Sequence, residues 1–337
     1  LTGLARFDVD NLVGDIEATA TAGGPLDVST NDAGDDGILI ALGDANASIQ
    51  TASGNTDTVE INAAGMTNAG SDTLKLGGGA ATIEVTNLVG NLDADGDLVG
   101  STSVGNTPFD GTLNVTTGLL DQSDGTEFVL GDGVTNITAN QDPSGDTSTG
   151  QTDLTIKAAA LDTEALSLSG DADIDVDDAS TNIDAASLTG ELDVDSESDS
   201  TFTLTTGSGR TALTGASGST LTVNAAQLAQ DGTVSASGGN AELTLDGGSD
   251  SGSMTVDNIA SDIDASAYTG TLTINSAGVD GSLDGDATTP VMDVITGTGD
   301  TTVSGDDAIT NTEDLDITVD GSQLAGTGNT LTLKGDA

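Results

Sequence analysis

Aspartate is the residue type in this sequence whose spacing could support chemistry. Residues 171–178 read Asp-Ala-Asp-Ile-Asp-Val-Asp-Asp, and Asp193 and Asp195 repeat the alternation about twenty positions later. In a strand, the aspartates at odd positions would share one face and the apolar residues the other. If the two segments lie on adjacent rungs, carboxylates about 5 Å apart repel each other by about 0.8 kcal/mol per pair even in bulk water. Raised pKa values of the carboxyl groups or bound cations would relieve this repulsion, and multivalent cations such as calcium are the simpler answer.

Further acidic clusters lie in turn-like, glycine-containing segments. Residues 91–97 alternate oxygen ligands as a calcium loop does, although an EF-hand would require Glu where Thr102 stands. Similar clusters occur at 280–286 and 297–307. Asp and Gly also form ordinary solvated turns, so both interpretations stay open for any single cluster. The calcium ligands that we predict are Asp93, Asp95, Asp97, Asp173, Asp175, Asp177, Asp193, Asp195, Asp284, Asp286, Asp300, Asp306 and Asp307.

The composition excludes several classes of function. The chain has 337 residues, 56 Asp and Glu against five Lys and Arg, a formal net charge of −51, and neither Cys nor His. Disulfides, Cys/His zinc sites and His-based catalytic triads are therefore excluded, and so is binding to nucleic acid phosphates. No apolar run approaches the roughly 18 residues that a membrane span needs. We expect no enzymatic activity, because basic groups and sugar-stacking aromatic residues are both scarce.

The elements that position these residues are predicted to be short strands. Apolar and polar residues alternate with period two in segments such as 82–85, 112–115 and 220–223, each bounded by Gly, Asp, Asn or Ser. Such segments recur at about ten-residue intervals almost throughout, and none indicates an amphipathic helix of three turns. The sequence therefore predicts an all-β fold.

Internal repeats favour one architecture for these strands. The phrase at 85–94 recurs at 9–18 and 256–265, and more loosely at 176–185. A second unit places Asn or Asp after a strand, then two small residues and an apolar anchor. Its polar positions Asp184, Asn224 and Asp264 are 40 and 40 residues apart, as two coils of about 20 residues or one unusually long coil would give. We predict an elongated parallel β-solenoid, whose narrow core needs few aromatic residues. Tandem β-sandwich domains are the alternative, although their cores usually use aromatic anchors.

Breaks in the rhythm at 100–111, around Pro108, and at 141–150 bear on domain organisation. We predict one solenoid part over 1–140, a loop or bend at 141–150, where Pro143 stands, and a second part over 151–337. The chain begins at Leu1 without Met or a leader, which we interpret as a processed product or a piece of a longer protein.

Threonine triplets provide a competing interpretation of function. Thr-Leu-Thr occurs at 220–222, 271–273 and 330–332, and stacked triplets would present flat rows of hydroxyl groups to ice or to a glycan. Thr is, however, a favoured outward residue on any strand. The triplets are also not evenly spaced in sequence, as we expect an ordered array to require.

A resemblance to known proteins follows from two of these segments. Residues 297–309 resemble a degenerate pair of the glycine- and aspartate-rich nonapeptides of repeat-in-toxin proteins, and the phrases at 183–192 and 263–272 resemble those of secreted bacterial surface proteins, S-layer proteins among them. The sequence departs from that pattern because it lacks a run of intact Gly-Gly-x-Gly-x-Asp units. The resemblance implies export, a location at the cell surface, folding with Ca²⁺ as cofactor, and self-assembly into a lattice or filament. The implied partners are copies of the chain and cell-surface polysaccharide. An adhesin or an ice- or glycan-binding segment is the alternative.

Overall fold

The structure, a computed structural model, describes part of the chain. The described residues are 5–8, 16–19, 26–30, 38–42, 46–51, 58–66, 72–78, 82–95, 108–121, 125–143, 152–161, 164–228, 243–247, 252–259, 261–276, 291–304, 316–324 and 329–334. They form strands and no helix, so that the prediction of an all-β fold is confirmed. No helix in these ranges has the length and apolar character that a membrane crossing requires. The chain divides into two compact units, Leu1–Asp177 and Asp178–Ala337.

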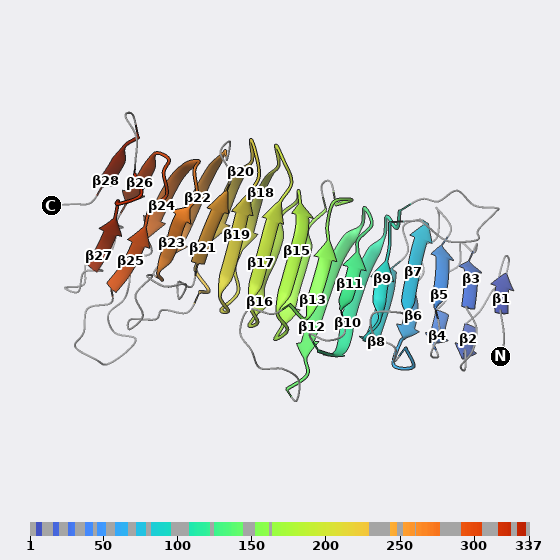
Figure 1. Cartoon of the computed structure of the whole chain (residues 1–337). Coiled ribbons are helices and arrows are strands. Elements are labelled where there is room, and N and C mark those ends of the chain that lie inside the picture. The colour runs from blue at the N-terminus through green and yellow to red at the C-terminus, as the bar shows by residue number, and fades with distance from the viewer. Residues whose placement is uncertain are drawn as a thin grey trace. The chain divides into compact units, whose positions relative to one another are not determined.

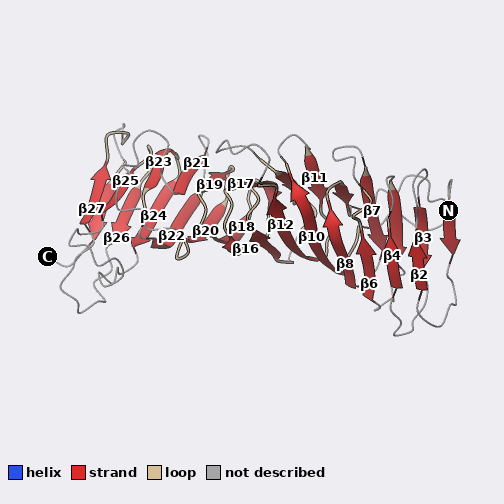
Figure 2. Cartoon of the chain, turned by 90° about the horizontal axis from the view of Figure 1, so that it is seen from below, coloured by secondary structure: helices blue, strands red, loops and turns tan. Residues whose placement is uncertain are grey.

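The first unit stacks its strands into two parallel sheets (Figures 1 and 2). Odd-numbered strands form sheet A: β1 (Ala5–Asp8), β3 (Leu26–Thr30), β5 (Ala47–Thr51), β7 (Thr73–Gly78), β9 (Asn91–Asp93), β11 (Thr126–Val129), β13 (Leu154–Lys157) and β15 (Ile174–Ala179). Even-numbered strands form sheet B: β2 (Ile16–Thr19), β4 (Ile38–Ala41), β6 (Thr58–Asn62), β8 (Thr82–Leu88), β10 (Thr112–Leu120), β12 (Val134–Gln141) and β14 (Leu166–Gly170).

The second unit repeats this arrangement. Its sheet A contains β17 (Leu192–Ser196), β19 (Thr211–Gly215), β21 (Leu243–Gly247), β23 (Ile263–Ala267), β25 (Val291–Ile295) and β27 (Asp316–Asp320). Its sheet B contains β16 (Ile183–Leu188), β18 (Thr201–Thr205), β20 (Thr220–Asn224), β22 (Ser253–Ile259), β24 (Thr271–Ser276), β26 (Thr301–Ser304) and β28 (Leu331–Lys334). Consecutive strands alternate between the sheets, so each coil contributes one strand to each. The parallel β-solenoid is thereby confirmed, and the strands that the structure describes form no antiparallel sandwich.

Columns of aliphatic side chains fill the space between the two sheets. In the first unit, Ile61, Val85, Val115, Ile137 and Leu168 occupy equivalent positions on five successive strands of sheet B and are all at most 2% exposed. Each such side chain contributes roughly 1.5–3 kcal/mol when buried. This column explains how the chain forms a core with five aromatic residues.

The repeated phrases are corners of the coils. Asp264 Oδ1 accepts a hydrogen bond from the backbone N–H of Ser266 at 2.9 Å, and Tyr268 N donates to Ala265 O at 2.9 Å, which places the Tyr268 side chain in the core. Burial raises the pKa of Tyr268 to about 12. The same Asx turn occurs at Asn62 and Asp184. In each case the side-chain oxygen satisfies the backbone N–H two residues later within the same corner.

The two intervals of 40 residues between Asp184, Asn224 and Asp264 correspond to different numbers of coils. Asp184 on β16 and Asn224 on β20 lie two coils apart on sheet B, as predicted. Asp264 lies on β23 of sheet A, so the second interval is not a whole number of coils. Two regular coils are not formed there, because the connection from β20 (ending at Asn224) to β21 (starting at Leu243) is longer than those between β16 and β20.

A residue with a left-handed backbone conformation explains the repeated phrase at 85–94, 176–185 and 256–265. Asn87, Asp178 and Asn258 occupy the same place in their phrases and have φ values of 60°, 56° and 60°. Asn and Asp tolerate this conformation better than other residues with side chains. The bend returns the next residue to the core, where Leu88 and Ile259 are fully buried.

Gly-x-Gly segments let successive corners touch. A Cβ atom at Gly297 would lie 1.8 Å from the carbonyl oxygen of Tyr268, and one at Gly299 would lie 1.9 Å from that of Gly270. The corner of the coil before leaves no room for a side chain at either position. This close approach gives two glycines of the repeat-in-toxin-like segment a packing role, and the resemblance itself stays a prediction.

We expect Gly297→Ala to lower the free energy of unfolding by about 1–3 kcal/mol, because the added methyl group meets backbone rather than a movable side chain. Gly321→Ala is the matched control, since its Cβ would first meet the flexible Leu324 side chain at 3.3 Å. Chemical denaturation should place the control within about 0.5 kcal/mol of the parent. Equal losses in the two variants would contradict the close approach.

Candidate functional site

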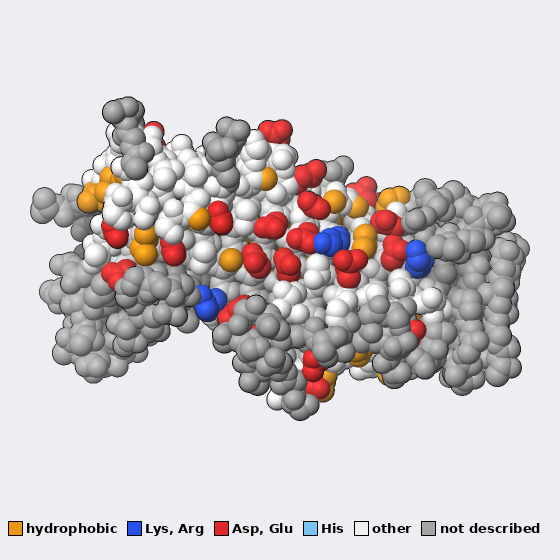
Figure 3. Space-filling view, in the orientation of Figure 1, with side chains coloured by type: hydrophobic (Ala, Val, Ile, Leu, Met, Phe, Trp, Pro, Cys, Tyr) orange, Lys and Arg blue, Asp and Glu red, His pale blue; other side chains and the backbone are white. Residues whose placement is uncertain are grey.

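The outer face of sheet A in the first unit presents acidic side chains. On β15, Ile174 and Val176 are buried, whereas Asp173, Asp175 and Asp177 stand half-exposed on the other side, as predicted. Figure 3 shows Asp and Glu side chains gathered over this sheet, with few Lys or Arg among them. The alternation that fills the core therefore also arranges the carboxylates on one surface.

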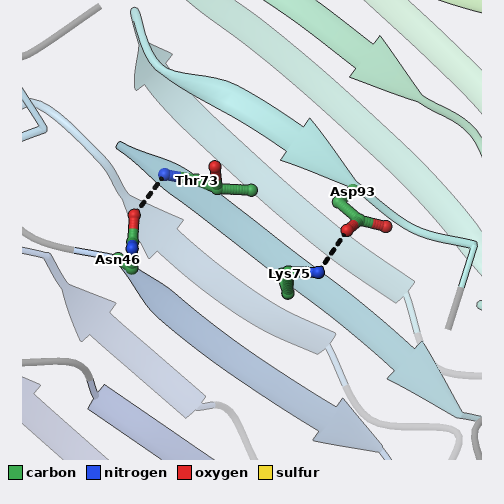
Figure 4. A network of polar contacts seen from close by, with 4 residues as sticks. All are labelled: Asn46, Thr73, Lys75 and Asp93. Atoms are coloured by element: carbon green, nitrogen blue, oxygen red, sulfur yellow. Dashed lines mark hydrogen bonds and ion pairs between the residues drawn. The ribbon is translucent and has the colours of Figure 1, made fainter. Parts of the chain in front are cut away.

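Lysines on this face pair with aspartates one rung away. Lys75 on β7 and Asp93 on β9 are register partners, and Lys75 Nζ lies 2.6 Å from Asp93 Oδ2 (Figure 4). Lys157 on β13 donates in the same way to its register partner Asp177, which raises the pKa of Lys157. Partly exposed ion pairs of this kind stabilise a fold only modestly, by about 0–1 kcal/mol each. Each pair nevertheless places an attraction between neighbouring strands where a second acid would cause repulsion.

The predicted ligand set at 93–97 is only partly described. Burial raises the pKa of Asp93 despite its contact with Lys75, and the nearby Asp95 carboxylate adds to the rise. Asp93 Oδ1 is buried and receives no hydrogen bond, and Asp95 is exposed in the bend that follows β9. Asp97 lies outside the described residues. The structure therefore brings Asp93 and Asp95 together, with Lys75 as a third charge.

Asp153 is a buried acid that sequence reasoning missed. It precedes β13, is 2% exposed, and accepts hydrogen bonds on Oδ2 from Asp173 N at 2.9 Å and Gln141 Nε2 at 3.1 Å. Burial raises its pKa, and the charges of Asp173 and Asp121 act in the same direction. The signal in the sequence was its position directly before a strand.

Polar side chains directly before a strand fix the register of the next strand in several coils. Asn46 Oδ1 accepts from Thr73 N at 2.8 Å, and Asn182 Oδ1 accepts from Thr203 N at 2.8 Å. Asp300, a predicted calcium ligand, accepts at Oδ1 from both the backbone N–H and the hydroxyl group of Thr330. Each side chain thus holds the backbone of the next rung, so a short oxygen-bearing side chain before a strand has a structural use.

The remaining predicted ligands divide into two groups. Asp193 and Asp195 stand exposed on the outer face of β17 in the second unit, two positions apart. Those outside the described residues, beyond Asp97, are Asp284, Asp286, Asp306 and Asp307. Within the described ranges, no three acidic side chains come together in a way that could hold a metal ion. The predicted loop at 141–150 is described only as far as Pro143, so this break stays a prediction.

The outer face of sheet B in the second unit has a different chemistry. Register aligns six threonines on six consecutive strands, which are Thr203, Thr222, Thr255, Thr273, Thr302 and Thr332. A second column, two residues earlier, contains Thr201, Thr220, Ser253 and Thr271. All ten are exposed or half-exposed. The expectation that uneven sequence spacing would prevent an ordered array is wrong, because connections of different length leave the strands in register. We call these ten residues the hydroxyl face.

The raised pKa of Asp153 predicts a pH-dependent effect of its substitution. A carboxyl group with a raised pKa contributes most stability below its ordinary value, near 3.9, and loses that contribution as the pH rises through the folded-state value. Asp153→Asn keeps an acceptor oxygen without the buried charge. We expect this variant to unfold at a higher temperature than the parent at pH 7, and at the same temperature near pH 3. A loss of stability independent of pH in thermal unfolding at fixed salt would contradict the assignment.

Comparisons with protein-family models, with curated proteins and with solved structures found no match to this chain. A functional proposal must therefore rest on the residues of the outer faces and on the way in which the solenoid arranges them.

Proposed function

We propose that the chain is an extracellular structural protein that self-assembles into a calcium-dependent surface lattice or filament. The observation that carries the proposal is the acidic outer face of sheet A, where β15 and the residue directly before it present three aspartates from alternate positions, Asp173, Asp175 and Asp177. With 56 acids and five bases in the chain, lysine pairs such as Lys75–Asp93 can neutralise few of these charges. Cations from solution must supply the rest.

Calcium suits this role because it takes six to eight oxygen ligands in flexible geometry. Two acidic faces of separate copies repel each other unless a multivalent cation lies between them. A cation shared in this way draws oxygen atoms from both copies, so one chain need supply only part of each ligand set. Acidic cell-surface polysaccharide could be bridged by the same cations.

A structural role agrees better with these faces than a catalytic one. Lys75 and Lys157 hold aspartates rather than standing in a cleft, and a carboxylate pair among 56 acids is no specific signal. The hydroxyl face supports a second candidate function, which is contact with a neutral and periodic partner. This candidate rests on the threonine columns of sheet B and not on the acidic face of sheet A.

Removal of calcium tests the proposal. We expect excess EDTA to dissociate the assemblies, as measured by sedimentation, and to lower the unfolding temperature, because the carboxylates then repel each other without a counterion. Added CaCl₂ should restore both, and Mg²⁺ should do so less well, since it demands octahedral geometry and keeps its water. NaCl at equal ionic strength controls for simple screening.

A matched pair of variants locates the effect. Asp173→Asn with Asp175→Asn should raise the calcium concentration needed for assembly, whereas Asp110→Asn with Asp132→Asn removes two exposed corner acids of the same unit and should not. Assembly and unfolding that are unchanged in EDTA would contradict the proposal.

A further inference from the structure

The hydroxyl face is a two-dimensional grid. Neighbouring rungs of a parallel sheet lie roughly 4.8 Å apart, and residues two positions apart along a strand lie about 6.6 Å apart. Thr220 and Thr222 on β20 therefore form one row, and Ser253 and Thr255 on β22 form the next. Each threonine adds one hydroxyl and one methyl group at a fixed grid point, so the face repeats the same chemistry in two directions.

The grid is held rigidly from below. Between its columns, Leu221, Met254 and Leu272 point into the core and are at most 2% exposed. The strands that bear them pair in parallel from β18 to β24, and the register is unbroken over the residues of the grid. Because the backbone is fixed in this way, ordering a ligand over the face requires little loss of conformational freedom by the protein.

The grid is also uncharged in a chain whose net charge is −51. None of its ten positions bears Asp, Glu, Lys or Arg. Exposed acids of the same unit lie on the sheet A strands, with Asp193 and Asp195 on β17 and Asp246 on β21, whereas Asp257 on β22 is half-exposed at the border of the grid, two positions after Thr255. A neutral partner can therefore approach sheet B without displacing cations from carboxylates on the grid itself.

These properties select one kind of partner. The cores of protein–protein interfaces are enriched in aromatic residues, Met and Arg, and the grid contains none of them. Sugar rings usually stack on aromatic faces, which the grid also lacks. A partner that is neutral, built of hydrogen-bond donors and acceptors, and periodic in two directions is crystalline water. We propose that the hydroxyl face binds the surface of ice.

The hydroxyl groups would hold surface water of the crystal by hydrogen bonds, while the methyl groups occupy the spaces between them and shed ordinary hydration water. This inference does not rest on the calcium-dependent assembly, because it concerns the opposite sheet and different side chains. Each of the two proposals can fail without the other.

Partition of the full chain into slowly growing ice tests the inference, in calcium-containing buffer that keeps the fold constant. We expect the parent protein to enter the ice fraction and to inhibit recrystallisation. Thr222→Tyr with Thr255→Tyr places two bulky rings at the centre of the grid and should lower partition by about tenfold or more, which corresponds to about 1.4 kcal/mol.

Thr214→Tyr with Thr244→Tyr is the matched control, because both residues are half-exposed on adjacent strands of sheet A in the same unit. This control should partition as the parent does, and circular dichroism should show both variants folded. Thr222→Val with Thr255→Val keeps the methyl groups and removes two hydroxyl groups, and it should give an intermediate loss.

Three results would overturn the inference. The parent protein could stay in the liquid fraction, or the control could lose partition as strongly as the grid variant. Alternatively, the tyrosines at the grid could abolish binding to insoluble polysaccharide or self-association in sedimentation without affecting ice, which would assign the face to those partners instead.

Discussion

Parallel, in-register stacking of one coil on the next is the constraint on which every other feature of this protein depends. Each residue lies one strand spacing from the equivalent residue of the neighbouring coil. The side chains at equivalent positions are therefore in contact, whether they are of the same type or of opposite charge. Repetition of aliphatic residues gives the core columns, such as Ile61, Val85 and Val115. Opposite charges at equivalent positions form an ion pair, as Lys75 and Asp93 do. Acids at equivalent positions repel each other. An acid-rich solenoid therefore depends on positive charge from its own few lysines or from solution.

The sequence predicts the fold well because the core obeys local rules. Period-two alternation located the strands, and the Asx phrases such as Ile61–Met66 are corners whose anchors are buried. Register was harder to predict, since it depends on connections whose lengths vary. Thr203 and Thr222 are 19 positions apart and Thr222 and Thr255 are 33 apart, yet both pairs are register partners. The hydroxyl face could not be recognised from sequence spacing for this reason.

The acidic sites were less predictable than the strands, because Asp has several uses in a solenoid. Asp300 holds the backbone and hydroxyl of Thr330, Asp177 pairs with Lys157, and Asp178 adopts a left-handed conformation within a repeat. A carboxylate that serves one of these roles has the same neighbours in sequence as one that binds a cation. The two outer faces also diverge freely, because the core restricts only the inward positions of each strand. This freedom lets the second unit present Asp193 and Asp195 on sheet A and the hydroxyl face on sheet B.

Disulfide cross-linking measures the register directly, and the absence of native cysteine makes the result unambiguous. Parallel register partners lie about 4.8 Å apart, within the Cα–Cα range of a disulfide, whereas residues two rungs apart are separated by about 9–10 Å. Thr222→Cys with Thr255→Cys should therefore cross-link within one chain under mild oxidation, and Thr222→Cys with Thr273→Cys should not. Efficient cross-linking of the second pair, or none of the first in a folded protein, would contradict the stacking on which this account depends.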